Sequence, residues 1–94
     1  MNDIYVARSS AVAARALDKE MVVMSMRDPT LFTLNEVAAE IWQAADGRTP
    51  LSSIVRDNIC VKFETEPDIA YADAEALCRQ LSERGILLLS DQPI

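Results

Sequence analysis

The hydrophobic residues of this chain change their spacing once, near Asn35. Up to Leu34 they tend to alternate with polar residues, as on a β-strand, and beyond Asn35 they recur every three or four residues, as on an amphipathic helix. The chain therefore divides into a strand-forming first third and a helical remainder. Its 94 residues, half of them apolar, suffice for one core, so we expect residues 1–94 to form a single domain.

The first third predicts three strands, Val12–Leu17, Glu20–Met26 and Leu31–Leu34. Asp18 and Lys19 form the expected two-residue turn of a hairpin. Residues 27–30 form a second turn, in which Pro29 fixes its own φ angle. One side of the middle strand carries Val22, Met24 and Met26. The short links between the strands indicate an antiparallel meander.

Two helices are expected next. Asn35 is a suitable N-cap and Gly47 a suitable C-terminal stop for the first helix. Thr49 then caps the second helix, with Pro50 at its first position. The apolar stripes of the two helices are Val37, Ile41, Trp42 and Ala45, and Leu51, Ile54, Val55, Ile59 and Phe63. Each helix is therefore expected to pack along one side.

The third helix, expected over residues 69–84, has three sectors. Its core stripe holds Ala70, Ala74, Leu77 and Leu81, with Cys78 at the margin. A second, shallower face holds Ile69, Ala72, Ala76 and Gln80, and a solvent sector holds Tyr71, Glu75, Arg79 and Ser82. Gly85 ends the helix, and residues 86–89 follow as a buried tail or short strand. Together the elements predict an α+β fold, a three-stranded antiparallel sheet followed by a three-helix bundle, arranged as in a winged helix-turn-helix.

The charge distribution argues against binding to nucleic acid. The chain has 9 basic and 15 acidic side chains, a net charge of −6. Residues 64–75 contain five acids and no base, and residues 28–47 contain four acids and no base. Such segments repel phosphate and suit a basic partner, so we expect no nucleic acid among the partners.

The sequence also lacks the usual groups of an active site. It contains no histidine, which removes histidine-assisted triads, histidine metal sites and the commonest general base. No glycine-rich phosphate loop or EF-hand spacing is present. Cys60 and Cys78 form no CxxC pair and are expected to be small buried thiols, with a disulfide between them as the alternative. We therefore expect no catalytic residue, no metal and no cofactor.

The hydrophobic stretches are too short for a membrane protein. None approaches the roughly 20 apolar residues that a membrane span needs. The first ten residues lack the apolar core of a signal peptide. We expect a cytoplasmic protein with no membrane partner.

The third predicted strand, Leu31–Leu34, leaves an edge with unpaired main-chain amides and no charge to protect it. One hypothesis is that a partner segment adds there as a fourth strand and places its side chains in neighbouring pockets. The alternative is that a terminus or a dimer partner covers the edge. Ala72 and Ala76 beside Ile69 would leave room for a guest side chain, although alanines also simply favour helix.

Several segments taken together resemble the PqqD-like family, which comprises pyrroloquinoline quinone biosynthesis protein D and related recognition domains for ribosomally made, post-translationally modified peptides (RiPPs). They are Leu34–Trp42 (LNEVAAEIW), Asp46 with Gly47, Thr49–Val55 (TPLSSIV), Asp73–Leu77 (DAEAL), and Leu81 followed by Gly85, Ile86 and Leu87. The resemblance spans residues 12–89. Ala74 and Leu77 depart from the larger side chains common in the family. The Ile-Trp pair resembles the broad family more than the branch dedicated to pyrroloquinoline quinone.

The resemblance implies a winged helix-turn-helix that does not read DNA. It implies a non-catalytic peptide chaperone that binds the leader segment of a precursor peptide by β-strand addition. The chaperone would present this peptide to a modifying enzyme such as a radical S-adenosylmethionine (radical SAM) protein, in RiPP or quinone-cofactor biosynthesis. The implied peptide contacts are Leu31, Phe32, Thr33 and Leu34 on the third strand, and Ile69, Ala72, Asp73, Ala76 and Gln80 on the third helix.

Two other classes of protein stay open. A winged-helix transcription regulator would need exposed basic residues on its third helix, where only Arg79 and Arg84 are available among acids. A dimeric structural subunit of a larger synthase would seal the edge at residues 31–34 in a homodimer. A homodimer through this edge is compatible with a peptide-binding protein as well.

Overall fold

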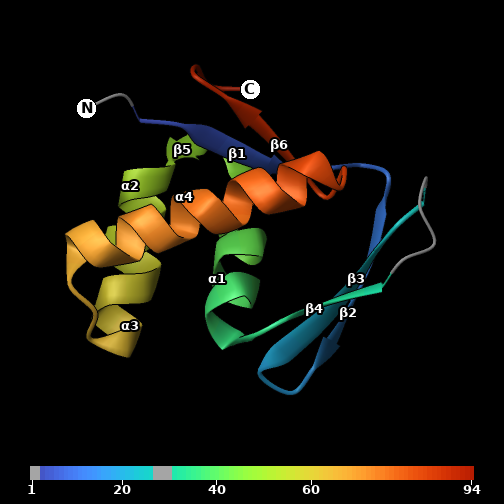
Figure 1. Ribbon diagram of the computed structural model, residues 1–94, viewed down its shortest axis with the longest axis horizontal. Coiled ribbons are helices and arrows are strands. Elements are labelled where there is room, and N and C mark those ends of the chain that lie inside the picture. The colour runs from blue at the N-terminus through green and yellow to red at the C-terminus, as the bar shows by residue number, and fades with distance from the viewer. Residues whose placement is uncertain (1–2, 27–30) are drawn as a thin grey trace.

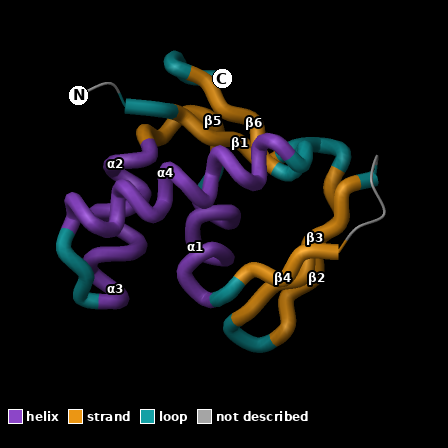
Figure 2. The backbone as a smooth tube through the Cα atoms, viewed as in Figure 1, coloured by secondary structure: helices purple, strands orange, loops and turns teal. Residues whose placement is uncertain are grey.

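The computed structural model describes residues 3–26 and 31–94 and has an α+β fold. Two three-stranded antiparallel sheets lie on two sides of a group of helices (Figures 1 and 2). One sheet and the helices form the predicted winged helix-turn-helix arrangement. The second sheet was not predicted. None of the helices in the described part of the chain is long and apolar enough to cross a membrane.

The wing is the sheet of β2 (Val12–Leu17), β3 (Glu20–Ser25) and β4 (Leu31–Leu34), in the order β2-β3-β4. The predicted strands are confirmed, except that β3 ends one residue before Met26. Asp18, at the first position of the two-residue turn, has a φ of 59°, as a tight hairpin turn requires. The second predicted turn, residues 27–30, lies outside the described residues.

The two faces of the wing differ in burial. Met21, Val23 and Ser25 of β3 are buried against the helices. Val22 and Met24, which the sequence placed together on one side, form the outer face and are half-buried. The side of β3 that faces the core is therefore the one with Met21, Val23 and Ser25, because these residues lie under the helices.

Helix α1 (Glu36–Ala44) begins as predicted, since Asn35 Oδ1 accepts a hydrogen bond of 2.8 Å from the Ala38 amide. The prediction that Gly47 stops the helix was wrong. The helix ends at Ala44, and Ala45 caps it by donating its amide hydrogen to the Trp42 carbonyl at 3.3 Å. Gly47 instead lies in strand β5 (Asp46–Pro50) with a φ of 79°.

The expected capping role of Thr49 was also wrong. Its amide and hydroxyl both donate to the Asp46 carboxylate, at 2.8 and 3.0 Å, which holds Thr49 in β5. The next helix starts at Leu51, and the carboxylate of Asp3 receives the amide of Ser52 at 3.2 Å. A residue distant in sequence therefore supplies the cap that Thr49 was expected to provide.

The second helical segment runs through α2 (Leu51–Ile54), the π-helical η1 (Val55–Cys60) and α3 (Val61–Phe63). It ends at Glu64, whose φ of 51° is left-handed. The predicted stripe faces the core: Leu51, Ile54, Val55 and Ile59 are buried, and Phe63 packs against them.

Helix α4 (Pro67–Glu83) begins two residues before the predicted start. Gly85, with a φ of 75°, ends it as predicted, because its amide bonds the Ser82 carbonyl and the Ile86 amide bonds the Leu81 carbonyl. The buried residues of α4 are Ala70, Ala74, Cys78 and Leu81. Tyr71, expected in solvent, is half-buried, and its hydroxyl donates to Asp3 Oδ1 at 3.3 Å.

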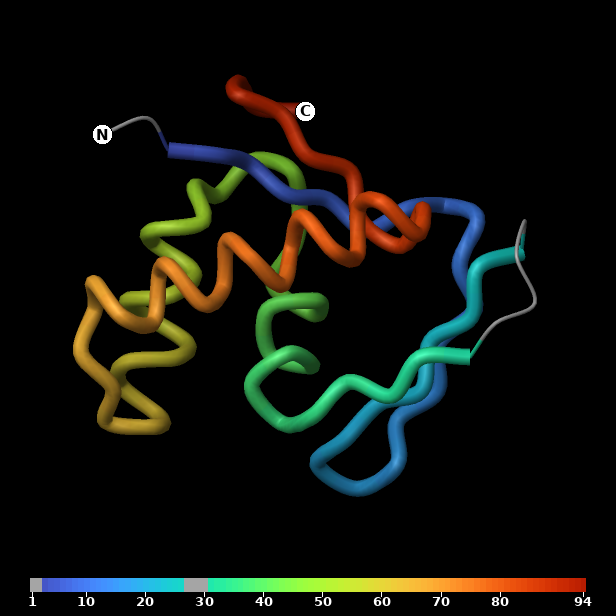
Figure 3. Tube along the Cα trace, in the orientation of Figure 1, coloured from blue at the N-terminus to red at the C-terminus, as the bar shows by residue number. Residues whose placement is uncertain are grey.

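The second sheet has the order β5-β1-β6, with β1 (Tyr5–Arg8) in the centre and β6 (Leu87–Ser90) at one edge. Strands β1 and β6 come from opposite ends of the chain and lie side by side (Figure 3). Strand β6 confirms the short-strand alternative for the tail. Val6 and Leu87 from this sheet complete the core beneath α4.

Candidate functional site

Strand β4 is an edge of the wing, since only β3 pairs with it. The direction of its free main-chain groups follows from the hairpin register. Leu17 and Glu20 flank the two-residue turn and lie opposite each other. In a hairpin of this kind, the two residues that close the turn are joined by main-chain hydrogen bonds. Main-chain groups alternate in direction along a strand, so those of Glu20 and Val22 point toward β2.

The intervening residues of β3, Met21 and Val23, therefore point their main-chain groups toward β4. Their partners there are Leu34 and Phe32. By the same alternation, the amide and carbonyl groups of Leu31 and Thr33 point away from the sheet. Two consecutive outward positions are enough to start pairing with an added strand.

The side chains of β4 divide in the same alternating way. Leu34 is 3% exposed and Phe32 packs against the core, so both face the helices. Leu31 and Thr33 are exposed on the outer face, with Leu31 at 64%. A strand added to β4 would likewise send alternate side chains toward the helices and toward the outside.

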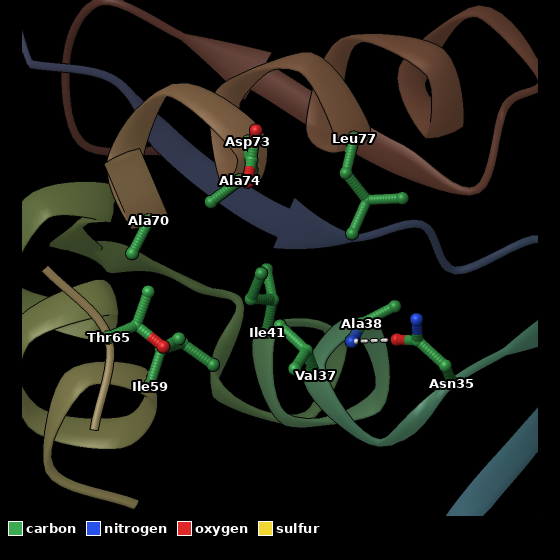
Figure 4. A pocket seen from close by; sticks show the side chains of 10 residues that line it. All are labelled: Asn35, Val37, Ala38, Ile41, Ile59, Thr65, Ala70, Asp73, Ala74 and Leu77. Carbon is green, nitrogen blue, oxygen red and sulfur yellow. Dashed lines mark hydrogen bonds between the residues drawn. The ribbon is translucent and has the colours of Figure 1, made fainter. Parts of the chain in front are cut away.

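A pocket of about 390 Å³ opens between α1, η1 and the first half of α4 (Figure 4). It is mostly apolar and is lined by Asn35, Val37, Ala38, Ile41, Ile59, Thr65, Ala70, Asp73, Ala74 and Leu77. Asp73 is its single carboxylate. The Asn35 side chain is held in place by the hydrogen bond that its Oδ1 accepts from the Ala38 amide (Figure 4).

A second pocket, of about 330 Å³, lies between β4 and the C-terminal turn of α4. It is lined by Phe32, Gln80, Leu81, Glu83 and Arg84. The Arg84 guanidinium carbon is 5.7 Å from the centroid of the Phe32 ring, a cation–π contact that joins the strand to the helix. Both pockets lie along α4, and β4 lines the second of them through Phe32. We call the two pockets together the groove.

The structure brings some of the predicted contact residues together in the groove. Asp73 lines the first pocket, and Phe32 and Gln80 line the second. Ile69, Ala72 and Ala76 share the exposed side of α4 with Asp73 and Gln80 but line neither pocket, and Ile69 is 56% exposed.

Sequence reasoning missed the contribution of α1 and its N-cap, namely Asn35, Val37, Ala38 and Ile41. It assigned Val37 and Ile41 to the core stripe, and only the tertiary packing shows that the stripe also lines a pocket. Arg84 was missed as well, although its spacing of seven residues from Leu77 places both on one side of a helix.

Other reactive groups lie apart from the groove or are buried. Both cysteines are free thiols: Cys78 is buried and Cys60 half-buried. Burial raises the pKa of the Cys78 thiol to about 12, so it stays protonated near neutral pH. The described residues contain no group of three or more histidine, cysteine, aspartate or glutamate side chains that could hold a metal ion.

Comparisons with known proteins identify the family to which the chain belongs. No curated protein matches the chain. A solved structure, TbiB1 in complex with the TbiA(beta) leader peptide, is similar over 86% of this chain and 93% of that one, at 26% sequence identity and a TM-score of 0.77. The family profile of coenzyme PQQ synthesis protein D (PqqD) matches residues 20–87. The chain therefore belongs to the PqqD family.

Proposed function

We propose that this protein binds the leader segment of a ribosomally made precursor peptide and holds it for a separate modifying enzyme. The observation that carries the proposal is the free edge of β4, with outward amide and carbonyl groups at Leu31 and Thr33, on the same strand whose Phe32 lines the second pocket of the groove. The similar protein TbiB1 has been solved with a leader peptide, which supports the same class of ligand here.

In this proposal the leader adds to the wing as a fourth strand. Its main chain bonds to Leu31 and Thr33, and every second side chain enters the groove. The proposed contacts are Leu31, Phe32, Thr33 and Leu34 on β4, and Ile69, Ala72, Asp73, Ala76 and Gln80 on α4. Leu34 contributes through the buried floor, because its side chain faces the core.

The protein itself would be a cytoplasmic, non-catalytic chaperone. The groove offers two carboxylates, Asp73 in the first pocket and Glu83 in the second, with no histidine or cysteine among the residues that line either pocket. The chemistry would belong to the partner enzyme, such as a radical SAM protein acting on a RiPP or quinone-cofactor precursor.

A winged-helix transcription regulator is disfavoured by the placement of its two candidate basic residues. Arg79 pairs with Glu75 at 3.7 Å. Arg84 stacks on Phe32. Both cations are therefore engaged with the protein's own side chains, on a helix rich in acids that repel phosphate.

A titration followed by nuclear magnetic resonance tests the proposal. Synthetic leader segments from the short open reading frames beside the gene are added to the isotope-labelled protein. We expect amide shifts over residues 31–34 and 69–80, while the amides of β1 stay unmoved. Shifts confined to other elements, or a stable dimer that no leader opens, would contradict the proposal.

A further inference from the structure

The outer face of the wing, opposite the groove, carries a shallow apolar hollow. Its volume is about 360 Å³, and it is lined by Ala13, Ala14, Arg15, Leu17, Val22, Met24 and Leu31. Leu17 and Leu31 are 49% and 64% exposed. The hollow extends to the β4 edge, where Leu31 lies.

The strand register arranges this face in rows that run across the sheet. Ala13 lies opposite Met24, and Met24 lies opposite Leu31; these three residues are named the outer row. A neighbouring row contains Arg15, Val22 and Thr33. The outer row is entirely apolar and ends at Leu31, which is 64% exposed because no strand lies beyond it.

The alternation of residue directions along β4 connects this row to the strand that a bound leader would add, which we call the guest strand. Leu31 offers its main-chain groups to an added strand, and its side chain faces outward. Residues directly opposite one another in a sheet send their side chains to the same face. The guest residue opposite Leu31 therefore lies on the outer face, where it cannot reach either pocket of the groove.

We propose that the protein selects side chains on both faces of the guest strand, and that the guest residue opposite Leu31 has an apolar side chain. This side chain extends the outer row by one member and covers part of the Leu31 surface, a gain typical of apolar cross-strand pairs. The inference rests on the proposed function, since it takes the β4 edge as the docking site. It assigns Leu31 as a specificity-determining residue outside the groove.

A guest strand fits this face better than a second copy of the chain does. Arg15 and Glu20 both lie on the outer face, and neither has an ion-pair partner among the described residues. A second copy packed flat on the face would bury both charges, which is costly. A single added strand leaves them in water and covers only the end of the outer row.

The test is a selection of short random segments displayed on phage, performed in parallel on the wild-type protein and on Leu31→Thr. Threonine suits an exposed edge strand, so the amide spectrum of the variant should stay that of the folded protein. We expect wild-type binders to share an apolar residue at one outward position, and variant binders to lose only that preference. A wild-type binder should bind the variant about fivefold more weakly.

Leu88→Thr is the matched control, because Leu88 is 48% exposed on β6 of the other sheet. Its selected segments and their affinities should equal those of the wild type. Identical preferences and affinities for Leu31→Thr and the wild type would overturn the inference. So would sedimentation showing a dimer that both Leu31→Thr and Leu17→Thr dissociate, since a second copy would then occupy the face. If no selected segment shifts the amides of Leu31 and Thr33, the proposed function itself fails.

Discussion

Asp3 joins three parts of the molecule that are far apart in sequence. Its carboxylate receives the amides of Ile4 and Ser52, the hydroxyl of Ser52 and the hydroxyl of Tyr71. It therefore caps the second helical segment and ties it to α4. Burial raises the pKa of Asp3, but the hydrogen bonds, those from Ser52 foremost, outweigh burial and leave the pKa below its usual 3.8.

This lowered pKa predicts a specific loss of stability in acid. The folded state binds the Asp3 proton less readily than the unfolded state, so the contribution is complete above about pH 4 and disappears as the pH falls through the lowered pKa. Asp3→Asn should reduce the free energy of unfolding by about 1 kcal/mol near neutral pH and by less in acid. Urea unfolding at both pH values checks this. Asp91→Asn, in the exposed C-terminal tail, is the control, and an equal acid loss in the wild type and Asp3→Asn would contradict the prediction.

The two glycines give a matched pair of substitutions, since both have a left-handed φ. A Cβ at Gly85 would lie 3.8 Å from its nearest neighbour, Ser25 Oγ, whereas a Cβ at Gly47 would lie 3.0 Å from Ile94 Cβ and 3.2 Å from Ala7 Cβ. Gly85→Ala should cost about 1 kcal/mol of unfolding free energy from backbone strain. Gly47→Ala should cost roughly 1 kcal/mol more from crowding. Thermal unfolding of both variants measures the difference, and equal losses would show that Ile94 gives way freely.

At the scale of elements, sequence reasoning succeeded where the signal is local. The three wing strands and the helix stripes are set by periodicity within each segment, and Asn35 and Gly85 act through neighbours a few residues away. Strands β1 and β5 were missed because they are short, and their pairing joins residues more than 35 positions apart. The Thr49 amide donates to the Asp46 carboxylate within β5, so Thr49 does not cap the next helix although its position suggested that role.

The features of the candidate site likewise divide into those that one element determines and those that depend on packing between elements. The β4 edge and the α4 face could be predicted, since each is a property of one element. The α1 wall of the first pocket, and the stacking of Arg84 on Phe32, depend on how elements pack against each other. Only the tertiary structure provides that information.

The β4 edge predicts a contrast between two proline substitutions. Thr33→Pro removes an amide that points away from β3, so the wing should persist while leader binding weakens roughly tenfold or more. Ala14→Pro is the control, because the same alternation directs the Ala14 amide to the opposite edge of the wing, at β2. Titration calorimetry with a bound leader measures both. Equal affinities for Thr33→Pro and Ala14→Pro would exclude strand addition at β4.

At the scale of the whole molecule, the two sheets have different relations to the chain. The wing is built from one continuous stretch, residues 12–34, and lines the second pocket of the groove through Phe32. The second sheet gathers segments from the start, middle and end of the chain, with β1 at its centre. This sheet packs against the helices, because Val6 and Leu87 are buried beneath α4. Beyond β6, Ile94 also donates its amide to the Gly47 carbonyl of β5, at 2.7 Å.

This arrangement predicts that the chain does not fold without β1, which lies outside the part that matches the PqqD profile. Removing residues 1–10 deletes the central strand, which leaves β5 and β6 unpaired and exposes the core around Ile4 and Val6, 5% and 0% exposed in the intact protein. Uncovering this much apolar surface costs several kcal/mol, a large part of the stability of a domain this small. We expect circular dichroism to show no cooperative thermal transition for the truncated chain, and Val6→Asn to lower the transition temperature of the full chain. A truncated protein that melts cooperatively near the wild-type temperature would instead mean that the wing and helices carry the fold, with the second sheet as an addition to it.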